Sequence, residues 1–162
     1  MKDHKLDKKT FLDLINQNKG IIHKISFLYS DTSEDREDLF QEICLQLWKS
    51  NGAYRGKAKY STWLYRVAIN TAINQIRKKK RNIHFQPIDG DQYAMPEADA
   101  RSEHSTVLFR EISRLSRIDK AIILLWLEEK KYEEIAEILG ITRTNVSVKL
   151  VRIKKELTEK IK

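Results

Sequence analysis

The stretch YEEIAEILGITRTNVSVKLVRIKKEL, residues Tyr132–Leu157, determines the fold of the C-terminal part of this chain. Its first half sets apolar residues on one face at helical spacing, namely Ile135, Ala136 and Leu139. Gly140 follows, where a left-handed residue ends a helix at least cost, and Thr142 can cap a second helix. The buried face of that helix is Val146, Leu150, Ile153 and Leu157. The pattern predicts a helix-turn-helix in which the small Ala136 allows a close crossing.

The opposite face of the second helix is polar and basic. It carries Arg143, Thr144, Ser147, Val148, Val151, Arg152 and Lys155. Arginine pairs bidentately with guanine, and hydroxyl and valine side chains suit other base edges and thymine methyl groups. This face therefore predicts entry into the DNA major groove. The alternative is a helical hairpin with a solvated basic face, and the motif alone is shared by many kinds of DNA-binding protein.

Composition narrows the class of protein. The chain has 162 residues, enough for one medium or two small domains, and its net charge of +8 favours a polyanionic partner. The single cysteine, Cys44, excludes an internal disulfide framework and a cysteine-rich zinc site. Because Cys44 lies among Phe40, Leu47 and Trp48, we predict a buried apolar thiol rather than a reactive one.

Targeting and catalytic signals are not found in the sequence. The start, MKDHKLDKKTF, has no apolar signal-peptide core. The longest apolar run, Ala121–Leu127, is too short to span a bilayer. We therefore expect a cytoplasmic protein without membrane insertion. The four histidines, His4, His23, His84 and His104, lack metal-ligand spacing. The sequence also suggests no nucleophile–base pair. We therefore predict no catalytic residue, no metal and no cofactor.

The segment Ile83–Ser105 separates two helical parts. It has no helical period, contains both prolines, Pro87 and Pro96, and carries a formal charge of −4. Its charged residues are the acids Asp89, Asp91, Glu97, Asp99 and Glu103 and one base, Arg101. Such a break is typical of a flexible linker. We predict an all-α protein with small helical domains at residues 1–82 and 106–162, joined by an acidic linker at 83–105.

The first domain is predicted to contain amphipathic helices that end near Gly20 and Tyr29, followed by a capping break at residues 31–33 and a long helix over Glu34–Ser50. In the long helix Leu39, Ile43 and Leu47 face inward. The outer face is mostly acidic, with Glu34, Asp35, Glu37, Asp38, Gln41, Glu42 and Gln46. These acids either favour the helix macrodipole or form a docking face for a basic protein partner.

A further helix is predicted from Ser61 to about Arg81. Its buried stripe is Leu64, Val67, Ala68, Thr71, Ala72 and Ile76, and its other side carries Arg66, Asn70, Asn74 and the consecutive cations of Arg77–Arg81. Further cations and aromatic side chains lie in and near the preceding loop: Arg55, Lys57, Lys59, Tyr54, Tyr60, Trp63 and Tyr65. Cations beside aromatic rings suit single-stranded nucleic acid. The alternative is a core helix with a basic C-terminal end, in which Trp63 is part of the core.

Three stretches together resemble a known family. In order they are DREDLFQEICLQLW, YRGKAKYSTWLYRVAINTAINQIRKKKR and the helix-turn-helix segment, and the motifs S-T-W-L-Y-R-V-A-x-N and D-L-x-Q-E are the most specific parts. They resemble the extracytoplasmic-function sigma factors of the sigma-70 family over nearly the whole chain. The resemblance implies a region 2 helical bundle and a region 4 helix-turn-helix. It also implies a non-enzymatic protein that directs promoter-specific initiation by core RNA polymerase.

The resemblance also implies roles for single residues. Asp38, Gln41 and Glu42 would dock on the clamp helices of the largest polymerase subunit. Recognition and melting of the minus-10 element would fall to a base-holding loop and the helix after it: Lys59, Tyr60, Ser61, Thr62, Arg66, Asn70, Asn74, Arg77 and Lys78. The minus-35 duplex would be read by Arg143, Thr144, Ser147, Val148, Val151, Arg152 and Lys155. Further implied partners are the flap of the second-largest subunit and an anti-sigma factor.

Two departures from the family pattern bear on specificity. Ser147, Val148 and Lys149 stand where many relatives are more basic, which implies a different minus-35 preference. Tyr60 stands where phenylalanine is common, so ring stacking is kept and a hydroxyl is added. Two other classes of protein share some of these features. A conventional helix-turn-helix regulator would bind duplex DNA alone, usually as a dimer. An RNA-binding protein or a nuclease would use the basic aromatic helix differently, and a nuclease would need carboxylates clustered near the cations.

Overall fold

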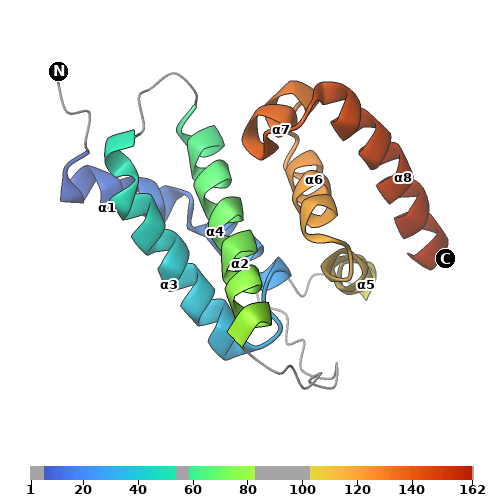
Figure 1. The fold of residues 1–162 in the computed structure, drawn as a ribbon, viewed down its shortest axis with the longest axis horizontal. Coiled ribbons are helices and arrows are strands. Elements are labelled where there is room, and N and C mark those ends of the chain that lie inside the picture. The colour runs from blue at the N-terminus through green and yellow to red at the C-terminus, as the bar shows by residue number, and fades with distance from the viewer. Residues whose placement is uncertain (1–5, 54–58, 83–102, 162) are drawn as a thin grey trace. The chain divides into compact units, whose positions relative to one another are not determined.

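A computed structural model of the chain describes residues 6–53, 59–82 and 103–161 (Figure 1). Within these ranges the secondary structure is entirely helical, with α-helices α1 to α8 and one short 3-10 turn, so the predicted all-α class is confirmed. The chain divides into two compact units, Met1–Tyr93 and Ala94–Lys162. The linker predicted at 83–105 contains this division, and its residues 83–102 lie outside the described ranges.

The first unit begins with α1 (Lys8–Gln17) and α2 (Lys19–Leu28). The first helix ends at Asn18, whose side-chain Nδ2 and backbone N–H both donate to the Leu14 carbonyl, at 2.8 and 3.1 Å. The end predicted near Gly20 thus lies two residues earlier, at the Asn18 C-cap. The asparagine satisfies a carbonyl that the helix end leaves open, and Gly20 lies inside α2.

Helix α3 (Ser33–Lys49) starts at Thr32, whose Oγ1 accepts a hydrogen bond from the Asp35 N–H at 3.1 Å. It packs against α2 and α4 (Tyr60–Asn82), and the short 3-10 turn η1 (Asn51–Ala53) follows it. Its three predicted core side chains are all buried, as expected: Leu39, Ile43 and Leu47. In Figure 1, α3 and α4 run side by side.

Helix α4 buries a wider face than the sequence predicts. Four members of the expected stripe are buried and two, Val67 and Ile76, are only half-buried. Tyr65 and Ile69 are buried as well, so the placement of Tyr65 among surface aromatics was wrong. The reason is that α4 packs against both α2 and α3, which covers more of the helix than one neighbour would.

The second unit comprises α5 (Glu103–Ser113), α6 (Arg117–Leu127), α7 (Tyr132–Leu139) and α8 (Arg143–Ile161). Helix α5 begins inside the segment expected to be linker, so residues 103–105 were wrongly assigned. These residues have no apolar periodicity of their own. They can still form the first turn of α5 through backbone hydrogen bonds, because the following turns pack against α6 and α8.

Cys44 is half-buried rather than fully buried, which corrects the expected depth of the thiol. Partial burial still raises its pKa, which lowers the thiolate fraction at neutral pH. No helix in the described parts of the chain is long and apolar enough to cross a membrane.

Candidate nucleic-acid interface

The turn between α7 and α8 has the predicted geometry. Gly140 has a left-handed φ of 69°, and its N–H donates to the Ala136 carbonyl at 2.9 Å. Thr142 Oγ1 accepts from the Asn145 N–H at 3.0 Å, which caps α8. The buried face of α7 differs in detail, because Ile138 is buried with Ile135 while Ala136 and Leu139 are half-buried.

Helix α8 separates a core face from an outer face. Its predicted core residues are all buried: Val146, Leu150, Ile153 and Leu157. Ser147 is half-buried, and the other predicted minus-35 residues are exposed: Arg143, Thr144, Val148, Val151, Arg152 and Lys155. Val148 and Val151 are 64% and 65% exposed, the largest fractions among the exposed large hydrophobic side chains of the described residues. One helix face thus presents apolar methyl groups among cations.

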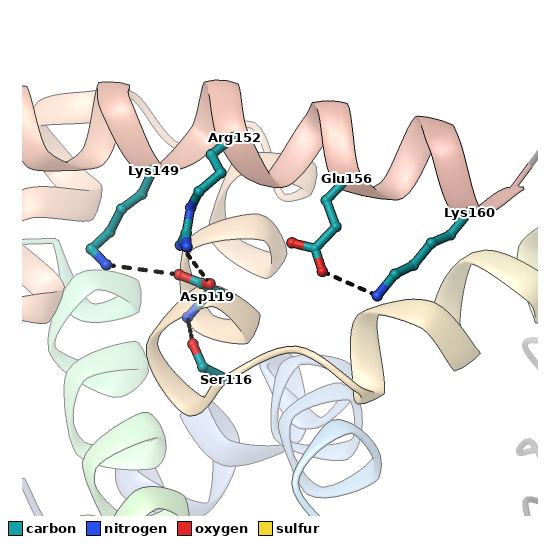
Figure 2. A network of polar contacts seen from close by, with 6 residues as sticks. All are labelled: Ser116, Asp119, Lys149, Arg152, Glu156 and Lys160. Carbon is teal, nitrogen blue, oxygen red and sulfur yellow. Dashed lines mark hydrogen bonds and ion pairs between the residues drawn. The ribbon is translucent and has the colours of Figure 1, made fainter.

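A buried carboxylate lies beneath this face (Figure 2). Arg152 Nη2 lies 2.8 Å from Asp119 Oδ2, and Lys149 Nζ lies 4.0 Å from Asp119 Oδ1. The Asp119 side chain is only 9% exposed, and its backbone N–H donates to Ser116 Oγ at 3.2 Å, the N-cap of α6. Sequence reasoning missed Asp119 and its contacts with Lys149 and Arg152. The pattern Ser-x-x-Asp at Ser116 and Asp119 can indicate a helix start. It does not indicate that Asp119 pairs with Arg152, 33 residues further along the chain.

A second carboxylate holds the first residue of α8. Arg143 Nε lies 2.7 Å from Glu133 Oε1, and both side chains are largely exposed. A hydrogen bond from its own backbone N–H and, after it, the charge of Arg143 lower the pKa of Glu133. Both arginines that the sequence assigned to base edges are therefore ion-paired within the second unit.

At the start of α4 the structure changes the predicted base-holding loop. The helix begins at Tyr60, so Ser61 and Thr62 belong to its first turn, and the Thr62 N–H donates to the Lys59 carbonyl at 3.0 Å. Thr62 is buried, because the helical backbone turns it to the face that also buries Tyr65, and its assignment to DNA stays a prediction. Tyr54, Arg55 and Lys57 lie outside the described residues.

The other residues of this region lie at the surface or partly at it. Lys59 is exposed, and Tyr60 and Ser61 are half-buried. The Tyr60 ring centroid lies 5.2 Å from that of Trp63, at an interplanar angle of 46°. The two rings form a tilted aromatic pair at the first turn of α4.

A polar groove of about 670 Å³ runs between α3 and α4. Six of its lining residues are Glu42 and Gln46 from α3 and Asn70, Asn74, Arg77 and Lys78 from α4. Arg66 is exposed on the same helix, whereas the side chains of Lys79–Arg81 lie outside what the structure describes. The groove joins residues that the sequence had assigned to two different partners. Gln46 Nε2 donates to Glu42 Oε1 at 2.9 Å, so the two α3 residues of the groove are hydrogen-bonded to each other.

The outer face of α3 carries an apolar residue that sequence reasoning missed. Asp38 and Gln41 are exposed and Glu42 is half-buried, as expected of a surface face. Leu45, one turn further, is 44% exposed. The spacing of positions 38, 41, 42 and 45 could have shown that Leu45 shares this face.

The second unit also has an apolar groove of about 460 Å³ on the C-terminal half of α8. Its lining includes Leu108, Ile123, Trp126, Leu127, Leu157 and Ile161. Lys154 Nζ lies 4.8 Å from the centre of the Trp126 ring. Among the residues described, no cluster of His, Cys, Asp and Glu could hold a metal ion.

Known families and relatives match both units. The family model "Sigma-70 region 2" matches residues 14–82, and the model "Sigma-70, region 4" matches residues 106–157. ECF RNA polymerase sigma factor SigW of Bacillus subtilis is 26% identical, with 96% of this chain and 91% of that protein covered. The ECF RNA polymerase sigma-E factor of Haemophilus influenzae is 29% identical, with 96% and 89% covered.

Solved structures share the fold. The sigma factor RpoE, in complex with the anti-sigma factor NepR from Bartonella quintana, superposes with a TM-score of 0.78 at 20% identity and covers 94% of this chain and 97% of its own. CnrH, in complex with the cytosolic domain of CnrY, gives a TM-score of 0.67 at 16% identity, with 94% and 88% covered. The two family models together with the curated relatives show that this chain belongs to the sigma-70 family, as a sigma factor of the extracytoplasmic-function group that directs promoter-specific transcription initiation.

Proposed function

We propose that the two units divide the promoter between them, with α8 reading the minus-35 duplex and α4 capturing the unpaired minus-10 strand. The observation that carries this proposal is the separation of faces on α8. A capped turn fixes the start of the helix, one face is buried in the second unit, and the other presents cations and methyl groups. That arrangement fits a helix in the major groove.

The groove beside α4 suits unpaired bases. Asparagine amides both donate and accept hydrogen bonds, so Asn70 and Asn74 can pair with the edges of a base that has left the duplex. Arg77 and Lys78, at the same groove, can contact phosphates. The Tyr60–Trp63 pair offers aromatic surface for stacking at the other end of the helix.

Promoter opening then follows from differential binding. Unstacking and unpairing a base costs a few kcal/mol. A protein offsets this cost only through contacts that exist in the open form and not in the duplex. The contacts proposed for α4 are of that kind, because base edges become accessible to Asn70 and Asn74 only after the strands separate.

We further propose that the exposed face of α3 docks on core RNA polymerase, at the clamp helices of the largest subunit. Protein interfaces commonly have an apolar centre and a polar rim. Leu45 supplies apolar surface, and Asp38, Gln41 and Glu42 supply acidic and amide groups around it. The flap of the second-largest subunit remains the partner proposed for the second unit, whose apolar groove suits protein side chains better than phosphate.

An anti-sigma factor is proposed as a regulatory partner. The structural relatives RpoE and CnrH are found in complexes with NepR and with the cytosolic domain of CnrY. A protein of that kind that covered the α3 face or the outer face of α8 would block the contacts proposed above. Added to transcription reactions, it should inhibit in competition with core polymerase.

The docking proposal is tested by reconstitution of this chain with purified core polymerase, followed by native gel shift and run-off transcription. Leu45→Arg should abolish both assembly and promoter-specific transcripts. Leu12→Arg is the matched control, because Leu12 is a leucine of similar exposure, 48%, on α1. Equal loss in the two variants, or full activity of Leu45→Arg, would reject the α3 face as the docking surface.

A further inference from the structure

The outer face of α8 carries two kinds of side chain. Its arginines are ion-paired within the second unit, whereas its valines are largely exposed. Arg143 forms an ion pair with Glu133, and Arg152 forms one with Asp119. Val148 and Val151 project from the same outer face with most of their surface exposed. This division bears on which groups of a base pair the helix can read.

Arg152 is the more constrained of the two arginines. A guanidinium recognises guanine by donating two hydrogen bonds to O6 and N7. Arg152 already donates one N–H of Nη2 to Asp119 Oδ2 at 2.8 Å, so any rotation of the guanidinium toward a guanine that breaks this contact is opposed. Asp119 is nearly fully buried, and Lys149 Nζ lies 4.0 Å from its Oδ1 (Figure 2). A buried carboxylate that loses its hydrogen-bond donor is costly.

The valines have no such constraint. They are three residues apart on a helix, so their Cβ atoms lie about 5–6 Å from each other. The rise between base pairs is about 3.4 Å, so two such side chains can meet neighbouring pairs in the major groove. The apolar group that the major groove offers there is the C5 methyl of thymine.

We propose that the upstream element of this sigma factor is recognised through thymine methyl groups on neighbouring A·T pairs, contacted by Val148 and Val151. Arg152, held by Asp119, is a positioning residue that presents positive charge to the phosphate backbone and does not choose the base. This inference rests on the proposed role of α8 at the minus-35 duplex. It adds the chemical group that is read and the residues that read it.

The test uses holoenzyme made from core polymerase and the full chain, and a promoter library randomised only in the upstream duplex. The selected upstream element is then synthesised with thymine or with uracil, which lacks the methyl group, while the minus-10 element keeps its thymines. The selected pool should contain neighbouring A·T pairs. Uracil should weaken holoenzyme binding by about fourfold for each methyl group lost.

Variants separate the valines from the arginine. The double variant Val148→Ala, Val151→Ala should bind the thymine and uracil promoters equally. Val107→Ala, an exposed valine on α5, should keep the full difference. Arg152→Ala should weaken binding to all selected promoters by a similar factor, without changing which sequences are selected.

Three results would overturn the inference: equal binding of thymine and uracil promoters by the wild-type chain, an unchanged difference in the double variant, or loss of selection at a G·C pair in Arg152→Ala. Failure of the proposed function has a different signature, because then no upstream sequence would be enriched at all. Thermal unfolding of each variant shows whether the second unit remains folded.

Discussion

Helices α4 and α8 are the two long helices that we propose to contact promoter DNA, and they differ in how their polar side chains are held. On α8 the two arginines are ion-paired with carboxylates of α6 and α7. On α4 the side chains of Asn70 and Asn74 make no hydrogen bond to any other described residue. A duplex presents a rigid surface, which suits side chains held in place by ion pairs. An unpaired base has no fixed orientation, which suits amide side chains that can reorient to meet it.

The largest effect is expected in the cores beneath the two helices. Leu150→Ala should destabilise the second unit by about 2–5 kcal/mol, because it removes a buried side chain that leaves a cavity. Urea unfolding monitored by Trp126, in a chain with Trp48→Phe and Trp63→Phe, should show the shift. Leu64→Ala is the counterpart on α4 and should leave the Trp126 transition in place. A shift of that transition in both variants would mean that the units do not unfold separately.

The next effect sharpens the contrast between the two ion pairs of α8. Arg152→Ala should destabilise the second unit by about 1–3 kcal/mol, since it removes a donor from the buried Asp119 carboxylate. Arg143→Ala should leave the urea midpoint nearly unchanged, because its partner Glu133 is exposed. In an Asp119→Asn background the cost of Arg152→Ala should largely disappear. Equal costs in both backgrounds would remove Asp119 as the reason.

On α4 the comparable change is Tyr60→Ala, which should slow promoter opening more than it weakens the closed complex. Loss of one ring that stacks on a base costs about 1–3 kcal/mol. Tyr60→Phe keeps the ring and should open promoters at nearly the wild-type rate. The rate is measured with 2-aminopurine in the minus-10 element. Equal effects of Tyr60→Ala on binding and opening would argue against a base contact at Tyr60.

The smallest effect is expected for Glu133→Gln, which releases Arg143 and removes a negative charge beside α8. Thermal stability should not change. The dependence of promoter binding on salt should steepen by at most about one unit of the log–log slope, which corresponds to one added phosphate contact. A large change in sequence preference would mean that Glu133 orients Arg143 toward a base edge.

The sequence predicted best those features whose determining interaction is local. The turn at Gly140 and Thr142 depends on residues within one helical turn of each other, and so do the buried positions of α3. The fold class followed from the same local periods. The family resemblance was also carried by short contiguous motifs.

The sequence could not predict contacts between helices. The pairing of Arg152 with Asp119 joins residues 33 positions apart, and no local pattern connects them. Tyr65 and Thr62 are aromatic and polar, which suggested a surface, but packing by two neighbouring helices buries them. The groove between α3 and α4 likewise exists only when both helices are in place.

The most direct test of the division of labour is the kinetics of promoter opening as a function of holoenzyme concentration, with a promoter selected from randomised DNA. The concentration dependence gives the affinity of the closed complex, and the plateau gives the opening rate. We expect the Val148→Ala, Val151→Ala variant to lower the affinity at an unchanged plateau, and Tyr60→Ala to lower the plateau at an unchanged affinity. If both variants changed the same parameter, α4 and α8 would not have separate roles at the promoter.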